Sequence, residues 1–175
     1  MNFYAGAWSH QRDNKTNVLA SVERRTLGSQ QLVLLVALEG DMAGIALELL
    51  KTQLAAVTTT DNATATALVA AVPPMLASSI AVALLSGDAC FTAARNSACF
   101  LQRAASVTML RGDTHVQAGD YVIVSTRTEA TMLAQFTKPV LPSDALRNDL
   151  LDDVLSSAVA QLPNVGVAAA LATAL

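Results

Sequence analysis

Residues 31–40 read QLVLLVALEG, and this stretch decides the fold. Its aliphatic run from Leu32 to Leu38 has no polar interruption and is short and rich in branched residues. That pattern predicts a strand buried on both faces rather than a helix. We therefore expect residues 31–38 to form a central strand of a sheet.

Two further strands are predicted before this run. Residues 2–9 alternate in character, with Phe3, Ala5 and Ala7 on one face. Residues 17–26 continue the alternation after a polar turn. The first forty residues therefore predict three strands.

Two helices are expected next. Asp41 can cap a helix that ends near Val57, and Asp61 or Asn62 can cap a second helix over residues 63–72, which prolines end. The small residues of the second helix imply close packing. In the first helix, the apolar positions at helical spacing are Met42, Ile45, Leu49, Leu50 and Leu54.

The remaining chain predicts strands, then helices, then one strand. Two hairpins are expected, residues 79–85 with 90–102 and residues 107–110 with 115–125. The Arg-Gly-Asp triplet at 111–113 is interpreted as the second hairpin turn rather than as an integrin motif. Helices follow from Glu129, the second over residues 143–162, and a buried strand over 165–171 closes the fold.

The order of these elements predicts an α+β fold. Blocks of strands alternate with blocks of helices and show no regular βαβ repeat, which indicates antiparallel sheets covered by helices. A length of 175 residues suits one domain, residues 1–175.

Composition excludes some classes of partner. The net charge is −3 and the eleven Lys and Arg residues are scattered, so nucleic acid is not an expected ligand. No signal peptide is seen at the start, which predicts a cytoplasmic protein. Prolines and hydroxyl residues interrupt the most apolar region, residues 63–85, so no membrane span is expected.

Two further expectations come from the apolar residues. The hydrophobic fraction of 53% predicts a large core or an apolar face covered by a partner, so a homodimer is one alternative. Cys90 and Cys99 are predicted to be reduced core residues. Their odd separation would place them on opposite faces of a single strand.

Five stretches, in order, provide more specific landmarks. They are RDNKTN at 12–17, VALEGDMAG at 36–44, FTAARNSACFL at 91–101, QAGDYVIVSTRT at 117–128 and PNVG at 163–166. Together they resemble the metal-dependent type 2C protein phosphatases over nearly the whole chain, and Gly119-Asp120 with its following strand is the most specific match. The resemblance implies a four-layer α-β-β-α sandwich in a minimal form.

The resemblance also implies a site for two divalent metals. In that family the metals are bridged by a carboxylate and create a hydroxide that attacks a phosphoserine or phosphothreonine. An ungapped register places Leu38 at the bridging aspartate, whereas one inserted residue places Glu39 and Gly40 there. The positions that correspond to the metal site are Asn17, Glu39, Gly40, Asn96, Arg127 and Asn164, with Pro163 at a further acidic position.

These replacements remove most of the metal ligands. At most one carboxylate, Glu39, remains, and hard cations need several oxygen ligands with negative charge. Arg127 places a fixed positive charge where a cation should bind. The sequence therefore predicts no bound metal and no catalytic residue, with Mg²⁺ or Mn²⁺ near Glu39 only in the alternative of an active enzyme.

Arg127 and Arg12 admit two interpretations. They can form a positive pocket that binds phosphate without cleaving it, or Arg127 can pair with Glu39 in place of a metal. The alternative is that both are ordinary solvated residues.

Three functions remain open from the sequence. The first is a pseudophosphatase that binds a protein partner, phosphorylated or not. The second is an active serine/threonine phosphatase with an atypical metal site, and the third is a structural homodimer subunit.

Overall fold

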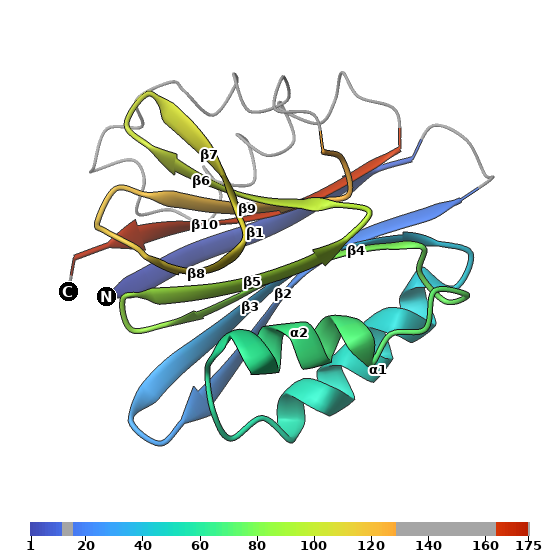
Figure 1. Cartoon of the computed structure of the whole chain (residues 1–175), viewed down its shortest axis with the longest axis horizontal. Coiled ribbons are helices and arrows are strands. Elements are labelled where there is room, and N and C mark those ends of the chain that lie inside the picture. Colours follow the sequence, from blue (N-terminus) through green and yellow to red (C-terminus); the bar gives the residue numbers. More distant parts are fainter. Residues whose placement is uncertain (12–15, 129–163, 175) are drawn as a thin grey trace.

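Two antiparallel sheets form a sandwich (Figure 1) in the computed structural model, which describes residues 1–11, 16–128 and 164–174. Sheet A contains, in spatial order, β1 (Asn2–His10), β10 (Val165–Thr173), β9 (Tyr121–Ser125), β6 (Ala98–Arg103) and β7 (Ser106–Leu110). Sheet B contains, in spatial order, β2 (Asn17–Leu27), β3 (Gln30–Gly40), β4 (Ser79–Ser86), β5 (Ala89–Arg95) and β8 (Gly112–His115).

Two helices cover the face of sheet B that is turned away from sheet A (Figure 1). They are α1 (Ala43–Ala55) and α2 (Asn62–Ala70). The α+β sandwich predicted from the sequence is therefore confirmed. Neither helix of the described ranges has the length and apolar character of a membrane span.

The strand β3 separates two hydrophobic cores. Successive side chains of a strand point to opposite faces, so Leu34 packs among the helix residues and Leu35 packs against sheet A. We call these two sides of sheet B the helix-covered face and the inter-sheet face. The predicted burial of this strand on both faces, inside its sheet between β2 and β4, is confirmed.

Four other predicted elements are also confirmed. The strands β1 and β2 occupy the expected ranges, with Phe3, Ala5 and Ala7 directed to the inter-sheet core. The closing strand β10 is buried between β1 and β9. The helix α2 has Asp61 as its cap, which accepts a hydrogen bond of 2.7 Å from the Thr64 backbone N–H.

The predicted cap of α1 and the first turn of its predicted buried face need correction. Met42 occupies the N-cap position and no side chain caps the helix, so Asp41 does not have the expected role. Met42 and Ile45 are 50% and 58% exposed, whereas small residues in the same turns, Ala43 and Ala46, are buried. Leu50 and Leu54, further along the predicted apolar stripe, are buried as expected, so the pattern was wrong only at the start of the helix, where small side chains let α1 lie close against sheet B.

Residues 90–102 form two strands rather than one. The chain leaves sheet B after β5 and enters sheet A at β6, and the connection passes through Asn96, whose φ is 53°. Asparagine tolerates this left-handed conformation better than most residues. The continuous apolar pattern across the crossing gave the wrong prediction.

The Arg-Gly-Asp triplet is likewise a crossing between sheets and not a hairpin turn. β7 lies in sheet A, whereas Gly112 and Asp113 belong to β8 at the edge of sheet B. Gly112 has φ of +92°, which explains the need for glycine there. The strand expected over residues 115–125 begins only at Tyr121, because residues 117–120 form a turn. Six strands therefore lie between α2 and residue 128, where four were expected.

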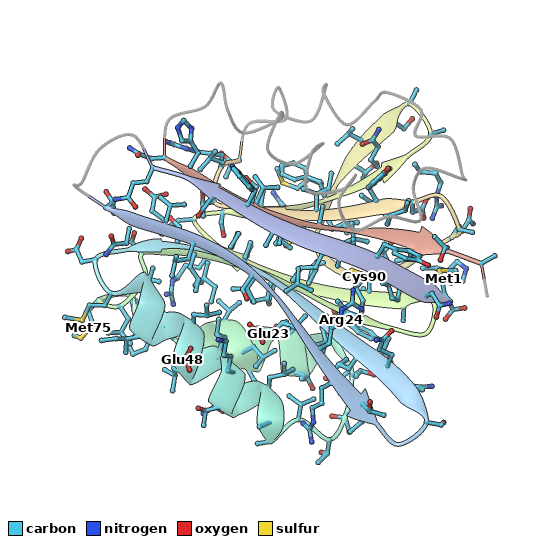
Figure 2. The ribbon with its side chains drawn as sticks, turned by 180° about the vertical axis from the view of Figure 1, so that it is seen from behind. Met1, Glu23, Arg24, Glu48, Met75 and Cys90 are labelled. Carbon is cyan, nitrogen blue, oxygen red and sulfur yellow. The ribbon has the colours of Figure 1, made fainter. Side chains whose placement is uncertain are left out.

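The cysteines are buried and free, as predicted. Both belong to the inter-sheet core. They lie on strands of different sheets, β5 and β6, so the opposite faces expected for a single strand do not apply. Cys90 lies between the two sheets in Figure 2. Burial raises the pKa of Cys99 to about 12 and raises the pKa of Cys90 as well.

The helices expected between Glu129 and Leu162 fall outside the described residues, and so does the second helical layer of the predicted four-layer sandwich. On the described strands of sheet A, the face turned away from sheet B carries fully buried apolar side chains, among them Phe100 and Ile123.

Candidate functional site

Sheet B brings four of the predicted metal-site positions to one end of the sandwich. Asn17 pairs with Gly40 across β2 and β3, and the neighbouring Glu39 pairs with the first residue of β4. The second residue of β4 pairs with the last residue of β5, so Asn96 follows at the same end.

Sheet A brings Arg127 and Asn164 to this end. The last residue of β9 pairs with Val167, near the start of β10. Arg127 follows the end of β9 and Asn164 precedes the start of β10, so both lie at the same end of sheet A. The two sheets approach closely here, because a Cβ atom added at Gly166 would lie 2.7 Å from the Leu19 carbonyl oxygen. We call the six positions the strand-end cluster: Asn17, Glu39, Gly40, Asn96, Arg127 and Asn164.

The two residues considered for the position of the bridging carboxylate, Leu38 and Glu39, point to opposite faces of sheet B. Leu38 is fully buried in the core beneath the helices. Glu39 alternates with it, so its carboxylate lies on the inter-sheet face, where it is partly exposed. Of the two candidates, only Glu39 is directed toward the space between the strand ends.

Asn17 does not share the face of Glu39. It pairs with Gly40, one position further along β3, so its side chain is on the opposite face of sheet B. Its Nδ2 donates a hydrogen bond of 2.9 Å to the backbone carbonyl of Asp41. This amide therefore joins the start of β2 to the connection between β3 and α1.

Asn96 has a similar structural contact. Its Nδ2 donates a hydrogen bond of 3.0 Å to the backbone carbonyl of Ser78, and the Ser78 hydroxyl donates one of 3.2 Å to the carbonyl of Glu39. These bonds attach the segment before β4 to the ends of β3 and β5. Both asparagines thus donate to backbone oxygens, which a metal-binding carboxylate cannot do.

Arg127 follows a tightly bonded turn. Its backbone N–H donates a hydrogen bond of 3.0 Å to the hydroxyl of Ser125. The preceding Thr126 is buried and makes two hydrogen bonds with Gly166. The Thr126 hydroxyl accepts a bond of 3.1 Å from the Gly166 N–H, and the Thr126 N–H donates a bond of 3.0 Å to the Gly166 carbonyl. Sequence reasoning missed Thr126, although a hydroxyl residue ending an aliphatic strand was a usable signal.

Gly40 has a steric role that the sequence did not reveal. A Cβ atom at this position would lie 2.6 Å from the Ala77 Cα and 2.7 Å from the Leu76 carbonyl oxygen. The backbone of residues 73–78 can approach β3 only because glycine is present. Arg95 holds the same segment, donating hydrogen bonds of 3.0 Å to the Val72 carbonyl and 2.7 Å to the Ala77 carbonyl.

The Gly119-Asp120 turn lies away from the strand-end cluster and is a structural feature. The buried Asp120 carboxylate accepts a hydrogen bond from the backbone N–H of Gln117, and its oxygens lie 2.7 Å from Arg103 Nη2 and 2.9 Å from Arg103 Nε. This contact raises the pKa of Arg103. Gly119, with φ of +94°, donates a backbone hydrogen bond to the end of β10. The turn therefore connects β6, β9 and β10.

The phosphate pocket predicted from Arg12 and Arg127 has one member in the described ranges. Arg12 lies outside them, and Arg127 is partly buried at the strand-end cluster.

The residues of the strand-end cluster do not fit a pair of Mg²⁺ or Mn²⁺ ions. Such ions need several carboxylate groups, and the cluster offers a single one, that of Glu39. The amides of Asn17 and Asn96 donate to backbone carbonyls instead. Within the described ranges, no three His, Cys, Asp or Glu side chains gather as metal ligands would.

Comparisons with solved structures show the same architecture. The serine/threonine phosphatase of S. agalactiae is 12% identical with a TM-score of 0.64, covering 99% of this chain and 100% of that chain. The Mycobacterium tuberculosis serine/threonine phosphatase PstP is 15% identical with a TM-score of 0.56, covering 98% and 99%. A structure from the bacterial stressosome is 12% identical with a TM-score of 0.66, covering 97% and 100%.

No protein-family model and no curated protein sequence matches the chain. The structural matches extend over nearly the full length of the chain, and at identities of 10–15% they establish the fold. The chain therefore has the α+β sandwich fold of the metal-dependent type 2C protein phosphatases.

Proposed function

We propose that this chain is a non-catalytic domain with the type 2C phosphatase fold that acts by binding a protein partner. The observation that carries the proposal is the chemistry of the strand-end cluster. One carboxylate faces the space between the sheets, while the two amides donate hydrogen bonds to backbone oxygens. A cluster used in this way supports the backbone and lacks the charge needed to hold two divalent cations.

One comparison is consistent with a role within a larger assembly. One similar structure comes from the stressosome, described as a modular system that has been adapted to control secondary messenger signalling. A domain of this fold that retains the scaffold while losing the metal ligands can function through its surface.

An active phosphatase with an atypical metal site is the second candidate. It is favoured by one observation, the inter-sheet direction and partial exposure of Glu39. A single carboxylate can hold a cation only weakly unless substrate oxygens complete the shell.

A turnover assay separates the two functions. The full chain is incubated with a phosphothreonine peptide and increasing Mn²⁺ or Mg²⁺, and phosphate release is measured. The proposal predicts release no faster than in metal solution alone. Release that depends on Mn²⁺ and is lost in Glu39→Ala, but kept in Glu48→Ala on exposed helix surface, would show an active enzyme.

A further inference from the structure

An apolar surface lies at the N-terminal end of α1, beside the strand-end cluster. Met42, Ile45 and Met75 are 50%, 58% and 81% exposed, and they are three of the five large hydrophobic side chains exposed in the described ranges. Met42 and Ile45 are three positions apart and so share one side of the helix. The Met42 N–H donates a hydrogen bond of 3.1 Å to the carbonyl of Leu76, which places Met75 next to them. We call these three residues the methionine patch.

The backbone that presents this patch is firmly held. Residues 73–78 form a turn closed by a hydrogen bond of 2.9 Å from the Leu76 N–H to the Pro73 carbonyl. Arg95 holds both ends of the turn, and Asn96 donates to the Ser78 carbonyl. The exposure of Met75 therefore does not come from a loosely attached loop, and its side chain lies at the outer edge of the helix layer (Figure 2).

The strand-end cluster supports the patch directly. Asn17 donates to the carbonyl of Asp41, the residue before Met42, and Gly40 leaves room for the turn that carries Met75. Residues at the positions of the family's metal site thus brace an exposed apolar surface. Contiguous exposed apolar side chains on a rigid backbone are characteristic of interaction sites, and methionine adapts its shape to a partner.

The exposed charges beside Met42 and Ile45 are acidic, while the Arg95 guanidinium near Met75 is bonded to the backbone carbonyls of Val72 and Ala77. Asp41 adjoins Met42 and is exposed, and its carboxylate has no ion pair within the described ranges. Glu48 follows Ile45 by one turn, and its carboxylate shares Lys51 with Glu23, at 2.9 and 3.8 Å respectively. Glu23 of β2 and Glu48 of α1 share this one lysine, so the surface formed by the three side chains keeps a net negative charge.

We infer that the methionine patch is the docking surface for a helical segment of another protein, with large apolar side chains on one face and Lys or Arg at its edge. The inference rests on the binding part of the proposed function. The patch follows one side of α1 over a helical turn, which suits the ridge of a second helix. The basic residue would pair with Asp41. A second copy of this chain fits less well, because a two-fold contact through the patch would bring the two Asp41 carboxylates together.

Selection from a displayed library of helical peptides, with the full chain as target, tests the inference. We expect enriched peptides with apolar residues at i and i+4 and flanking Lys or Arg. One such peptide is then titrated against the wild type and two variants. The double variant Met42→Gln/Met75→Gln should bind at least about fivefold more weakly, whereas Met109→Gln, a similarly exposed methionine in sheet A, should bind as the wild type does.

Methyl NMR of ¹³C-labelled methionine locates the peptide independently. The signals of Met42 and Met75 should shift on titration and that of Met109 should not. A selection without binders, unchanged affinity in the double variant, or shifts confined to other methionines would overturn the inference. Sedimentation that shows a dimer lost in the double variant would also overturn it, in favour of a second copy.

Failure of this inference is distinguishable from failure of the proposed function. Phosphopeptide turnover is measured on the same wild-type preparation. Turnover dependent on Mn²⁺ in a protein that binds the selected peptide through the patch would refute the non-catalytic role alone. An inactive protein that fails the peptide test would refute the docking surface alone.

Discussion

The Nδ2 atom of Asn17 donates a hydrogen bond of 2.9 Å to the backbone carbonyl of Asp41. This contact connects the first residue of β2 to the entrance of α1, at a position where the resemblance to type 2C phosphatases implies a metal-binding aspartate. A carboxylate cannot donate that bond. The position is therefore adapted to hold the backbone.

Asn17→Asp should destabilise the protein. The aspartate would replace a donor with an acceptor facing the Asp41 carbonyl, and loss of one hydrogen bond of this kind costs about 1 kcal/mol. Urea unfolding followed by circular dichroism measures the free energy of unfolding. Gln31→Glu makes the same amide-to-acid change at an exposed position of β3 and should have little effect. Equal stability of Asn17→Asp and wild type would contradict the structural role.

Two glycines close together in sequence should respond in opposite ways to alanine. Gly40→Ala should cost about 1 to 3 kcal/mol, because the new methyl group would collide with the backbone of Leu76 and Ala77. Gly44→Ala, in α1, meets nothing within 4 Å and should stabilise the helix by up to about 1 kcal/mol. Thermal unfolding of both variants tests the pair, and a neutral Gly40→Ala would show that residues 73–78 do not depend on this close approach.

Acid should weaken the capping of α2. The hydrogen bond from the Thr64 N–H lowers the pKa of Asp61 in the folded state. A lowered folded pKa means that the stabilisation is complete above the unfolded value of about 4 and is lost as pH falls through the folded pKa. Asp61→Ser keeps a capping oxygen that does not titrate in this range. The stability difference between wild type and Asp61→Ser should therefore move in favour of serine as pH falls below about 4, and a constant difference would be inconsistent with this cap.

The buried carboxylate of Asp120 should be a major contributor to stability. Asp120→Asn removes the charge facing Arg103 while retaining an oxygen for the Gln117 N–H. Because Arg103 is partly exposed, water replaces some of the lost interaction, and we expect a cost of about 2 kcal/mol. Asp88→Asn disrupts the exposed contact with His115 and should cost less than about 0.5 kcal/mol. Similar unfolding midpoints for the two variants would argue against the structural role of the Gly119-Asp120 turn.

Strands and their buried faces were predicted most accurately where the sequence pattern depends on burial alone. The run from Leu32 to Leu38 has to be a covered strand in any fold, and the alternation of Phe3, Ala5 and Ala7 identifies its buried face directly. The Asp61 cap was also predictable, because its hydrogen bond is local.

The crossings between sheets could not be predicted in the same way. An apolar residue is equally suitable in either sheet, so the pattern through Asn96 continues without a change when the chain moves from β5 to β6. The left-handed backbone at Asn96 and Gly112 was the available signal, and at Gly112 it was interpreted as a hairpin turn.

The resemblance supplied the positions of the candidate site but not the contacts that their side chains make. The resemblance identified the positions that the sheet registers bring to one end of the sandwich. It did not predict that Asn17 and Asn96 donate to backbone carbonyls, because hydrogen bonds between residues distant in sequence depend on the folded geometry. Helical spacing identified Leu50 and Leu54 as buried but missed the exposure of Met42 and Ile45, because the small residues Ala43 and Ala46 pack on the sheet in the first turns.

The central claim is that the strand-end cluster cannot hold paired divalent cations, and counting bound Mn²⁺ tests it most directly. Free Mn²⁺ is followed by electron paramagnetic resonance while the full chain is titrated, and the double variant Asn96→Asp/Arg127→Asp serves as a comparison that adds carboxylates. We predict no saturable binding to the wild type at micromolar Mn²⁺ and increased binding to the variant. Two ions bound tightly per wild-type chain, and released in Glu39→Ala, would contradict the account.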